Sequence, residues 1–327
     1  MTGERKSGLG GFICCVVGME QYALAGADIR VVARAEYVKK GAGPANRVGT
    51  LRYGAETLPV YGLSGLFGRA PESSVADRYV IVTRGDGESF GLLVDRIVRT
   101  PAGSPALLPL PAAAGATPSA WFDGLLRMGD VVFCLVLSPR GIDPLAPAAP
   151  RRATPPIAQP AGGRTGAVAS GMALTFTSAA LPSVHAARYA LAADRVGGIV
   201  QSLPWIPLPG AAPHIHAVGW WRDHAVPILR FNGEHGADVN GSERFLVARS
   251  GGRGRGGFFA FRVGADVALH RATAADRRHA EVERREWFTR GIFSVAGDAV
   301  ALLDVDAIIA GPGAVPQDAD GRVAAAV

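Results

Sequence analysis

The sequence predicts an all-β protein that contains two copies of one fold. Short segments rich in β-branched and aromatic residues alternate with Gly and Pro turns, which is typical of small, nearly closed β-barrels. The same landmarks also occur twice, in the same order. YALA begins at Tyr22 and again at Tyr189, an offset of 167, and LPVYGL around Pro59 corresponds to VPILRF around Pro227, an offset of 168.

Two further landmarks keep this spacing. RYVIVTR begins at Arg78 and RFLVARS at Arg244, an offset of 166, while Gly129 in the first copy matches Gly297, an offset of 168. A period of this length indicates a duplicated domain, because solenoid repeats span only about 20–50 residues. The 327 residues allow each copy its own core.

We expect four segments along the chain. The first domain spans 11–143 and the second spans 172–312. Between them, 144–171 is rich in Pro, Ala and Gly and has no apolar period, which predicts a semi-extended linker. Residues 313–327 have the composition of a loose C-terminal tail.

Within each copy we expect short strands in this order. The N-terminal stretch GFICCVV follows Arg5 and Lys6 as a signal peptide would, but it is short and lacks a cleavage site, so it predicts the first strand. Residues 78–98 form two β-rich runs around a Gly-Asp-Gly turn, and 244–264 repeat this hairpin with a longer Gly-Arg loop. VFCLVL adds a later strand.

One segment of the second copy predicts a helix. Residues 272–288 lack Pro and Gly and carry Glu281 and Arg285 at the i, i+4 spacing of a helical ion pair. We therefore expect a single charged and mostly exposed helix in an otherwise β-rich copy.

Composition excludes several classes of function. The three cysteines, Cys14, Cys15 and Cys134, form neither a disulfide framework nor a CxxC motif, which favours a cytoplasmic location and core packing of these residues. Apolar runs are far shorter than the roughly 20 residues of a membrane span, so we expect no membrane insertion. The net charge of +6 is spread along the chain, whereas nucleic-acid binding needs a one-sided basic stripe.

A catalytic site is indicated by one cluster only. No P-loop, HExxH or GxSxG motif is present, and no cofactor is expected. His214, His216 and His224 nevertheless lie close in sequence, and three imidazoles can hold a catalytic zinc ion. A metal-binding enzyme that uses these histidines is therefore the alternative to a protein without catalysis.

The sequence also contains a candidate protein-binding surface. Trp220 and Trp221 precede Arg222, and protein interfaces concentrate large aromatic residues and arginine. The structural alternative places one Trp in the core and the other flat on the barrel surface.

The ordered segments, found twice, resemble the CheW-like domain of bacterial chemotaxis signalling. In the first copy the resemblance rests on YALAGADIRVV, LPVYGL, FGLLVDRIV and GLLRMGDVVFCLVL. In the second it rests on YALAADRVGGIVQSLPWIPLP, VGWWRDHAVPILRF and GIFSVAGDAVALLDVDAII. The resemblance implies two small five-stranded SH3-like barrels per copy, with a hydrophobic groove between them. It also implies a non-catalytic adaptor that couples the cytoplasmic tips of chemoreceptors to a CheA-type histidine kinase.

The same resemblance singles out two arginines. The family's motif arginine, which lies a few positions before the proline, corresponds to Arg222, while the nearest arginine in the first copy, Arg52, lies farther from its proline. Asp223 stands where the family usually has glycine, and Val31 and Gly198 stand where it has an acidic residue.

Overall fold

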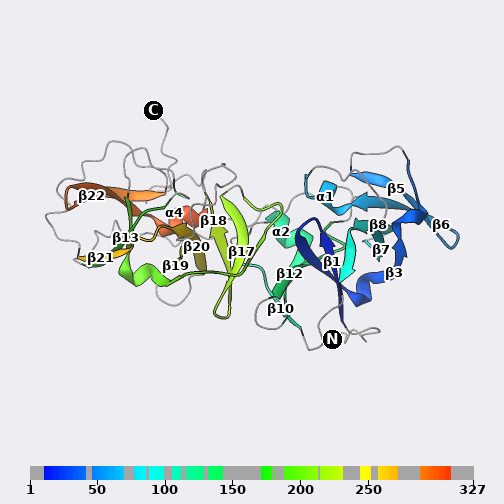
Figure 1. Cartoon of the computed structure of the whole chain (residues 1–327), viewed down its shortest axis with the longest axis horizontal. Helices are drawn as coiled ribbons and strands as arrows, with labels where there is room; N and C mark the ends of the chain where they lie inside the picture. Colours follow the sequence, from blue (N-terminus) through cyan, green and yellow to red (C-terminus); the bar gives the residue numbers. More distant parts are fainter. Residues whose placement is uncertain are drawn as a thin grey trace, which may run out of the picture. The chain divides into compact units, whose positions relative to one another are not determined.

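This computed structural model describes residues 11–41, 46–69, 77–85, 88–98, 105–111, 114, 116–128, 132–142, 171–178, 181, 188–212, 214–230, 244–251, 257–271 and 288–310. The chain divides into two compact units, each built mainly from one repeat (Figure 1). Each repeat contains two antiparallel-rich sheets, so the all-β, duplicated fold that the sequence predicts is confirmed.

The first repeat contains sheets 1a and 1b. Sheet 1a has the strand order β10 (Ala106–Leu108), β11 (Phe122–Met128), β12 (Val132–Leu137), β2 (Glu20–Ala25), β1 (Phe12–Val17), β9 (Arg96–Val98). Sheet 1b has the order β3 (Ile29–Arg34), β7 (Tyr79–Arg84), β8 (Ser89–Val94), β6 (Glu56–Gly62), β5 (Arg47–Tyr53), β4 (Val38–Lys39).

The second repeat contains sheets 2a and 2b. Sheet 2a has the order β21 (Ala268–Arg271), β13 (Met172–Phe176), β14 (Arg188–Ala192), β23 (Asp298–Leu303), β22 (Thr289–Val295). Sheet 2b has the order β15 (Val196–Val200), β19 (Arg244–Arg249), β20 (Phe258–Val263), β18 (His224–Leu229), β17 (Ile215–Trp221), β16 (Trp205–Pro207).

The two repeats share one topology. In each, the second strand pairs with the last strand, β2 with β12 and β14 with β23, whereas the first strand pairs with a strand that follows the other sheet, β1 with β9 and β13 with β21. Each sheet contains a parallel pair of strands: β2 with β12, β6 with β8, β14 with β23 and β18 with β20. Sheets 1a, 1b and 2b have six strands, not five, because short segments of two or three residues also pair at their edges.

The predicted strands lie where the sequence places them. β1 covers most of GFICCVV, and both hairpins form, β7 with β8 and β19 with β20. Cys14, Cys15 and Cys134 are all buried, with Cys14 and Cys134 in one apolar cluster of sheet 1a. The predicted charged helix, 272–288, falls outside the described residues except for its last residue.

Short helices occur at the ends of strands. They are α1 (Leu63–Leu66), α2 (Ala116–Trp121) and α4 (Val305–Ala310), with 3₁₀ turns at Gly26–Asp28, Ala35–Tyr37 and Ala193–Arg195. Within the part of the chain that the structure describes, no helix is long and apolar enough to span a membrane.

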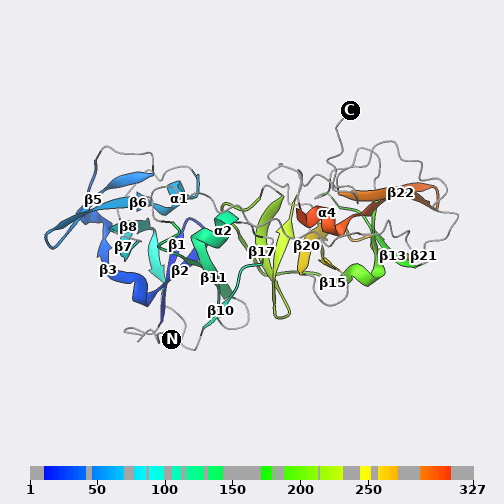
Figure 2. The ribbon, with the colours of Figure 1, turned by 180° about the vertical axis from the view of Figure 1, so that it is seen from behind.

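Helix α4 connects the two sheets of the second repeat. It follows β23 of sheet 2a and lies beside β20 of sheet 2b in both views (Figures 1 and 2). The Asp304 carboxylate caps it, accepting hydrogen bonds from the backbone N–H groups of residues 306 and 307 at 3.1 and 3.2 Å. Asp306 in turn accepts a 2.9 Å hydrogen bond from the Gly251 N–H and forms a 3.8 Å ion pair with Arg195.

In the first repeat an ion pair connects the two sheets. Arg69, which follows α1, donates two hydrogen bonds to the Glu20 carboxylate of β2, at 2.6 and 2.7 Å. The hydroxyl of buried Tyr22 donates to the same carboxylate at 2.5 Å. Such forked contacts fix geometry as well as adding energy, so they hold β2 in a defined position against the end of sheet 1b.

Candidate protein-interaction surface

The β17–β18 hairpin carries the arginine that the sequence singles out. Trp221 and His224 are the last cross-strand pair, so Arg222 and Asp223 form a two-residue turn. Arg222 has φ = 50°, in the left-handed region that disfavours residues with a Cβ. The local backbone therefore holds this arginine at the tip of the hairpin at some conformational cost.

The side chain of Arg222 lies on an aromatic ring. It is exposed, and its Cζ atom is 4.4 Å from the centre of the Trp221 ring. A guanidinium over an indole face gains about 0.5–1 kcal/mol at an exposed site, and its planar head keeps its donors available to a carboxylate. Within the described residues Arg222 forms no ion pair, so none of them neutralises its charge.

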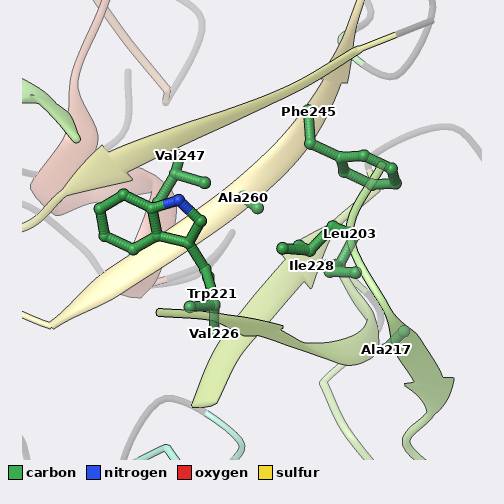
Figure 3. Close-up of a cluster of buried hydrophobic side chains, with 8 residues drawn as sticks. All are labelled: Leu203, Ala217, Trp221, Val226, Ile228, Phe245, Val247 and Ala260. Carbon is green, nitrogen blue, oxygen red and sulfur yellow. The ribbon is translucent and has the colours of Figure 1, made fainter. Parts of the chain in front are cut away.

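Trp221 belongs to the core of sheet 2b. It is 7% exposed, and Figure 3 shows its indole lying next to Val247. The full cluster consists of Leu203, Ala217, Trp221, Val226, Ile228, Phe245, Val247 and Ala260 (Figure 3).

The indole of Trp221 covers two glycines of β15. A Cβ at Gly197 would lie 3.3 Å from the ring atom Cη2 of Trp221, and one at Gly198 would lie 3.4 Å from Cζ2. The absence of side chains there gives the ring a flat surface to pack on. Gly198, which stands in place of the family's acidic residue, is therefore part of the floor under Trp221.

Trp220 has a different environment. It is half-buried, and its backbone N–H donates to the Pro204 carbonyl at 2.9 Å, next to edge strand β16. The structural alternative raised from the sequence, one core Trp and one nearer the surface, describes this pair. Trp220 and Trp221 as contact residues for a partner remain predictions.

Arg52 and Arg222 occupy different positions. Arg52 is exposed on β5, opposite Thr57, whereas Arg222 lies in a turn. At the offset of 168 that relates these two hairpins, the counterpart of Arg52 is Trp220, and the counterpart of Arg222 is Gly54. Arg52 is thus not the structural counterpart of Arg222, and its role in an interface stays a prediction.

The three histidines do not form a metal site, which corrects the alternative drawn from the sequence. His224 pairs across the hairpin with Trp221, at the turn. Trp221 is five residues along β17 from His216, which places the two ends roughly 17 Å apart at 3.3–3.4 Å per residue. The His216 ring centre is 5.3 Å from that of Trp205, and the His224 ring centre is 4.9 Å from that of Phe258. Among all described residues, no group of three or more His, Cys, Asp or Glu is placed to hold a metal ion.

His214 has a structural environment. It is buried just before β17, and burial lowers its pKa, while the nearby backbone of Ile309 in α4 opposes the shift. The neutral imidazole is thus favoured in the folded protein. It lies between the first strand of the β17–β18 hairpin and the helix that connects the sheets.

Comparison with known proteins defines the class. A family model described as the CheW-like domain matches residues 11–143 and again residues 180–312. The chain therefore belongs to the CheW-like domain family and carries the domain twice. This is a family of non-catalytic scaffold domains of chemotaxis signalling. The predicted ends of the linker, 144 and 171, remain predictions.

Among solved structures, the chain is similar to the scaffolding protein TtCheW from Thermoanaerobacter tengcongensis. The identity is 18% and the TM-score 0.34, over 41% of this chain and 92% of that chain. No curated protein matches the chain.

Proposed function

We propose that this tandem CheW-like protein is a cytoplasmic adaptor that couples chemoreceptors to a CheA-type histidine kinase, without catalysis of its own. Membership of the CheW-like family supports the adaptor class. The metal-dependent alternative loses its support, because His214, His216 and His224 lie apart.

The observation that carries the proposed site is the position of Arg222. An exposed arginine at the tip of a hairpin, resting on a largely buried Trp, is the composition that binding hot spots favour. The core beneath the Trp221 ring fixes the ring and hence limits the rotamers of the Arg222 side chain. The side chain therefore loses little conformational entropy on binding. We propose that the second repeat contacts its partner through Arg222, with Trp220 or Trp221 as neighbours.

Charge reversal at this position tests the proposal. The full chain and its Arg222→Glu variant are compared in pull-downs with the cognate kinase and with receptor cytoplasmic fragments. We expect the variant to bind at least one of them about 2–4 kcal/mol more weakly, as a hot spot would. Folding should persist, because surface substitutions usually change stability by no more than about 0.5 kcal/mol.

Arg52→Glu makes the same charge change at an exposed position of β5 in the first repeat, so it is the comparison that decides between the two candidate arginines. Unchanged partner binding by a natively folded Arg222→Glu protein would contradict the assignment. A loss confined to Arg52→Glu would transfer the site to the first repeat.

A further inference from the structure

A second arginine–aromatic pair adjoins the first. On the neighbouring hairpin, Arg249 and Phe258 face each other across β19 and β20, and the Cζ atom of Arg249 is 5.3 Å from the centre of the Phe258 ring. That ring lies edge-on to Trp221, with centres 4.9 Å apart and an interplanar angle of 62°. Arg222, Trp221, Phe258 and Arg249 therefore form one row, which we call the arginine–aromatic row.

The described residues do not balance the charge of this row. Arg222 and Arg249 are both exposed, and neither forms an ion pair among the described residues. Asp306 already accepts the Gly251 N–H and pairs with Arg195. Asp223, the neighbour of Arg222 in the turn, contributes one carboxylate to this end of sheet 2b.

In the first repeat, the equivalent position contains an ion pair between two residues of the same repeat. Its turn pair is Tyr53 with Glu56, the counterpart of Trp221 with His224. There Arg30 lies over the Tyr53 ring at 5.2 Å, pairs with Glu56 at 3.0 Å and donates to Ser89 at 2.7 Å.

The second repeat has different residues at the positions of Arg30, Glu56 and Ser89. Gly197 is the counterpart of Arg30 and His224 is the counterpart of Glu56, at offsets of 167 and 168, so both the arginine and its acid are missing. By strand register, Phe258 takes the place of Ser89, because it pairs with Arg249 as Ser89 pairs with Arg84. The equivalent site thus holds an internal arginine–carboxylate pair in the first repeat, whereas in the second it pairs each arginine with an aromatic ring.

We propose that the arginine–aromatic row binds an acidic segment of a protein partner, whose carboxylates bind Arg222 and Arg249 while apolar side chains pack against Phe258. This inference rests on the proposed adaptor function and names the chemistry of the partner segment at the same site. Guanidinium groups form forked hydrogen bonds with carboxylates, and the aromatic rings beneath restrict their motion. Two arginines, one at the end of each of two neighbouring hairpins, make a short site, unlike the extended basic stripe that a nucleic acid requires.

A binding assay with a defined probe tests this inference. The full chain is titrated into a short fluorescein-labelled peptide rich in Glu and Leu, and fluorescence anisotropy gives the affinity. We expect Arg222→Gln and Arg249→Gln each to weaken binding about tenfold, and the double variant by more than either alone. Binding should also weaken as salt increases, and the peptide with Gln in place of Glu should bind poorly.

Arg34→Gln is the matched control. Arg34 is an exposed arginine of the first repeat that also lies on an aromatic ring, 5.6 Å from the centre of Tyr79, but no second such pair adjoins it among the described residues. Its variant should bind the acidic peptide within about twofold of wild type. An equal loss in Arg34→Gln, equal binding of the Gln peptide, or tighter binding of labelled oligothymidylate would each overturn the inference, the last by indicating a nucleic-acid site.

Parallel pull-downs separate this inference from the adaptor function. If the kinase or receptor is captured equally by wild type and by the Arg222→Gln, Arg249→Gln double variant, the acidic-segment inference fails while the adaptor function stands. If wild type captures neither, the adaptor function fails, and the peptide titration alone decides the chemistry of the row.

Discussion

Arg222 occupies in the second repeat the turn position that Gly54 occupies in the first. Both residues follow the last strand residue of the equivalent hairpin, and both have positive φ, 50° for Arg222 and 61° for Gly54. Glycine adopts this conformation without strain, whereas arginine does not. The second repeat therefore has a charged side chain at a position where the first repeat shows that the fold needs no side chain.

The comparison predicts that Arg222→Gly separates binding from folding. Relief of the left-handed backbone gains about 1 kcal/mol, and loss of the contact with the Trp221 ring costs about 0.5–1 kcal/mol. We expect the free energy of unfolding to remain within about 1 kcal/mol of wild type while partner binding decreases. Denaturant unfolding followed by Trp fluorescence measures this, since most of the five Trp residues belong to the second repeat. A large loss of stability would mean that the arginine is a structural residue.

The two neighbouring tryptophans should differ in their effect on stability. Trp221→Ala removes a 7% exposed ring from the core of sheet 2b and should destabilise by about 3–5 kcal/mol. Trp220→Ala removes a half-buried ring and should cost about 1–2 kcal/mol. Thermal unfolding of both variants gives the comparison. The reverse order would show that the packing in Figure 3 does not dominate the stability of the hairpin.

Burial of His214 predicts a dependence of stability on pH. Its folded pKa is lowered from the ordinary value of 6.5, chiefly by burial, so the unfolded chain takes up the proton first as the pH falls. The contribution of neutral His214 is therefore complete above about pH 6.5 and is lost as the pH falls towards the folded pKa.

Comparison with His214→Gln isolates this contribution, because the carboxylates titrate equally in both proteins. The stability difference between wild type and variant should be constant above about pH 7 and should shift against wild type in acid. A difference that does not change with pH would show that His214 carries no perturbed proton equilibrium.

Much of the fold could be predicted from the sequence because its signals are local or repeated. Period-two apolar runs and Gly turns predict the hairpins β7–β8 and β19–β20, and the landmarks near Pro59 and Pro227 predict the duplication. The short helices α1 and α4 escaped prediction because four or six residues are too few to show a helical period.

The candidate site was only half predictable. Arg222 and Trp221 are adjacent in sequence, so their composition alone indicated a surface. Arg249 and Phe258 join them through the register of another hairpin and its packing on Trp221, which no local pattern encodes. For the three histidines the prediction was wrong, because proximity in sequence did not give proximity in space. An extended strand separates successive residues by about 3.3 Å.

The adaptor function itself is tested most directly by a sedimentation assay with membranes that contain the cognate chemoreceptor. The purified kinase is mixed with these membranes with and without the full chain, and the kinase in the pellet is quantified. We predict that the kinase sediments with the receptor membranes when wild-type protein is present and that Arg222→Glu reduces this fraction. The same amount of kinase in the pellet with and without the wild-type chain would contradict the account.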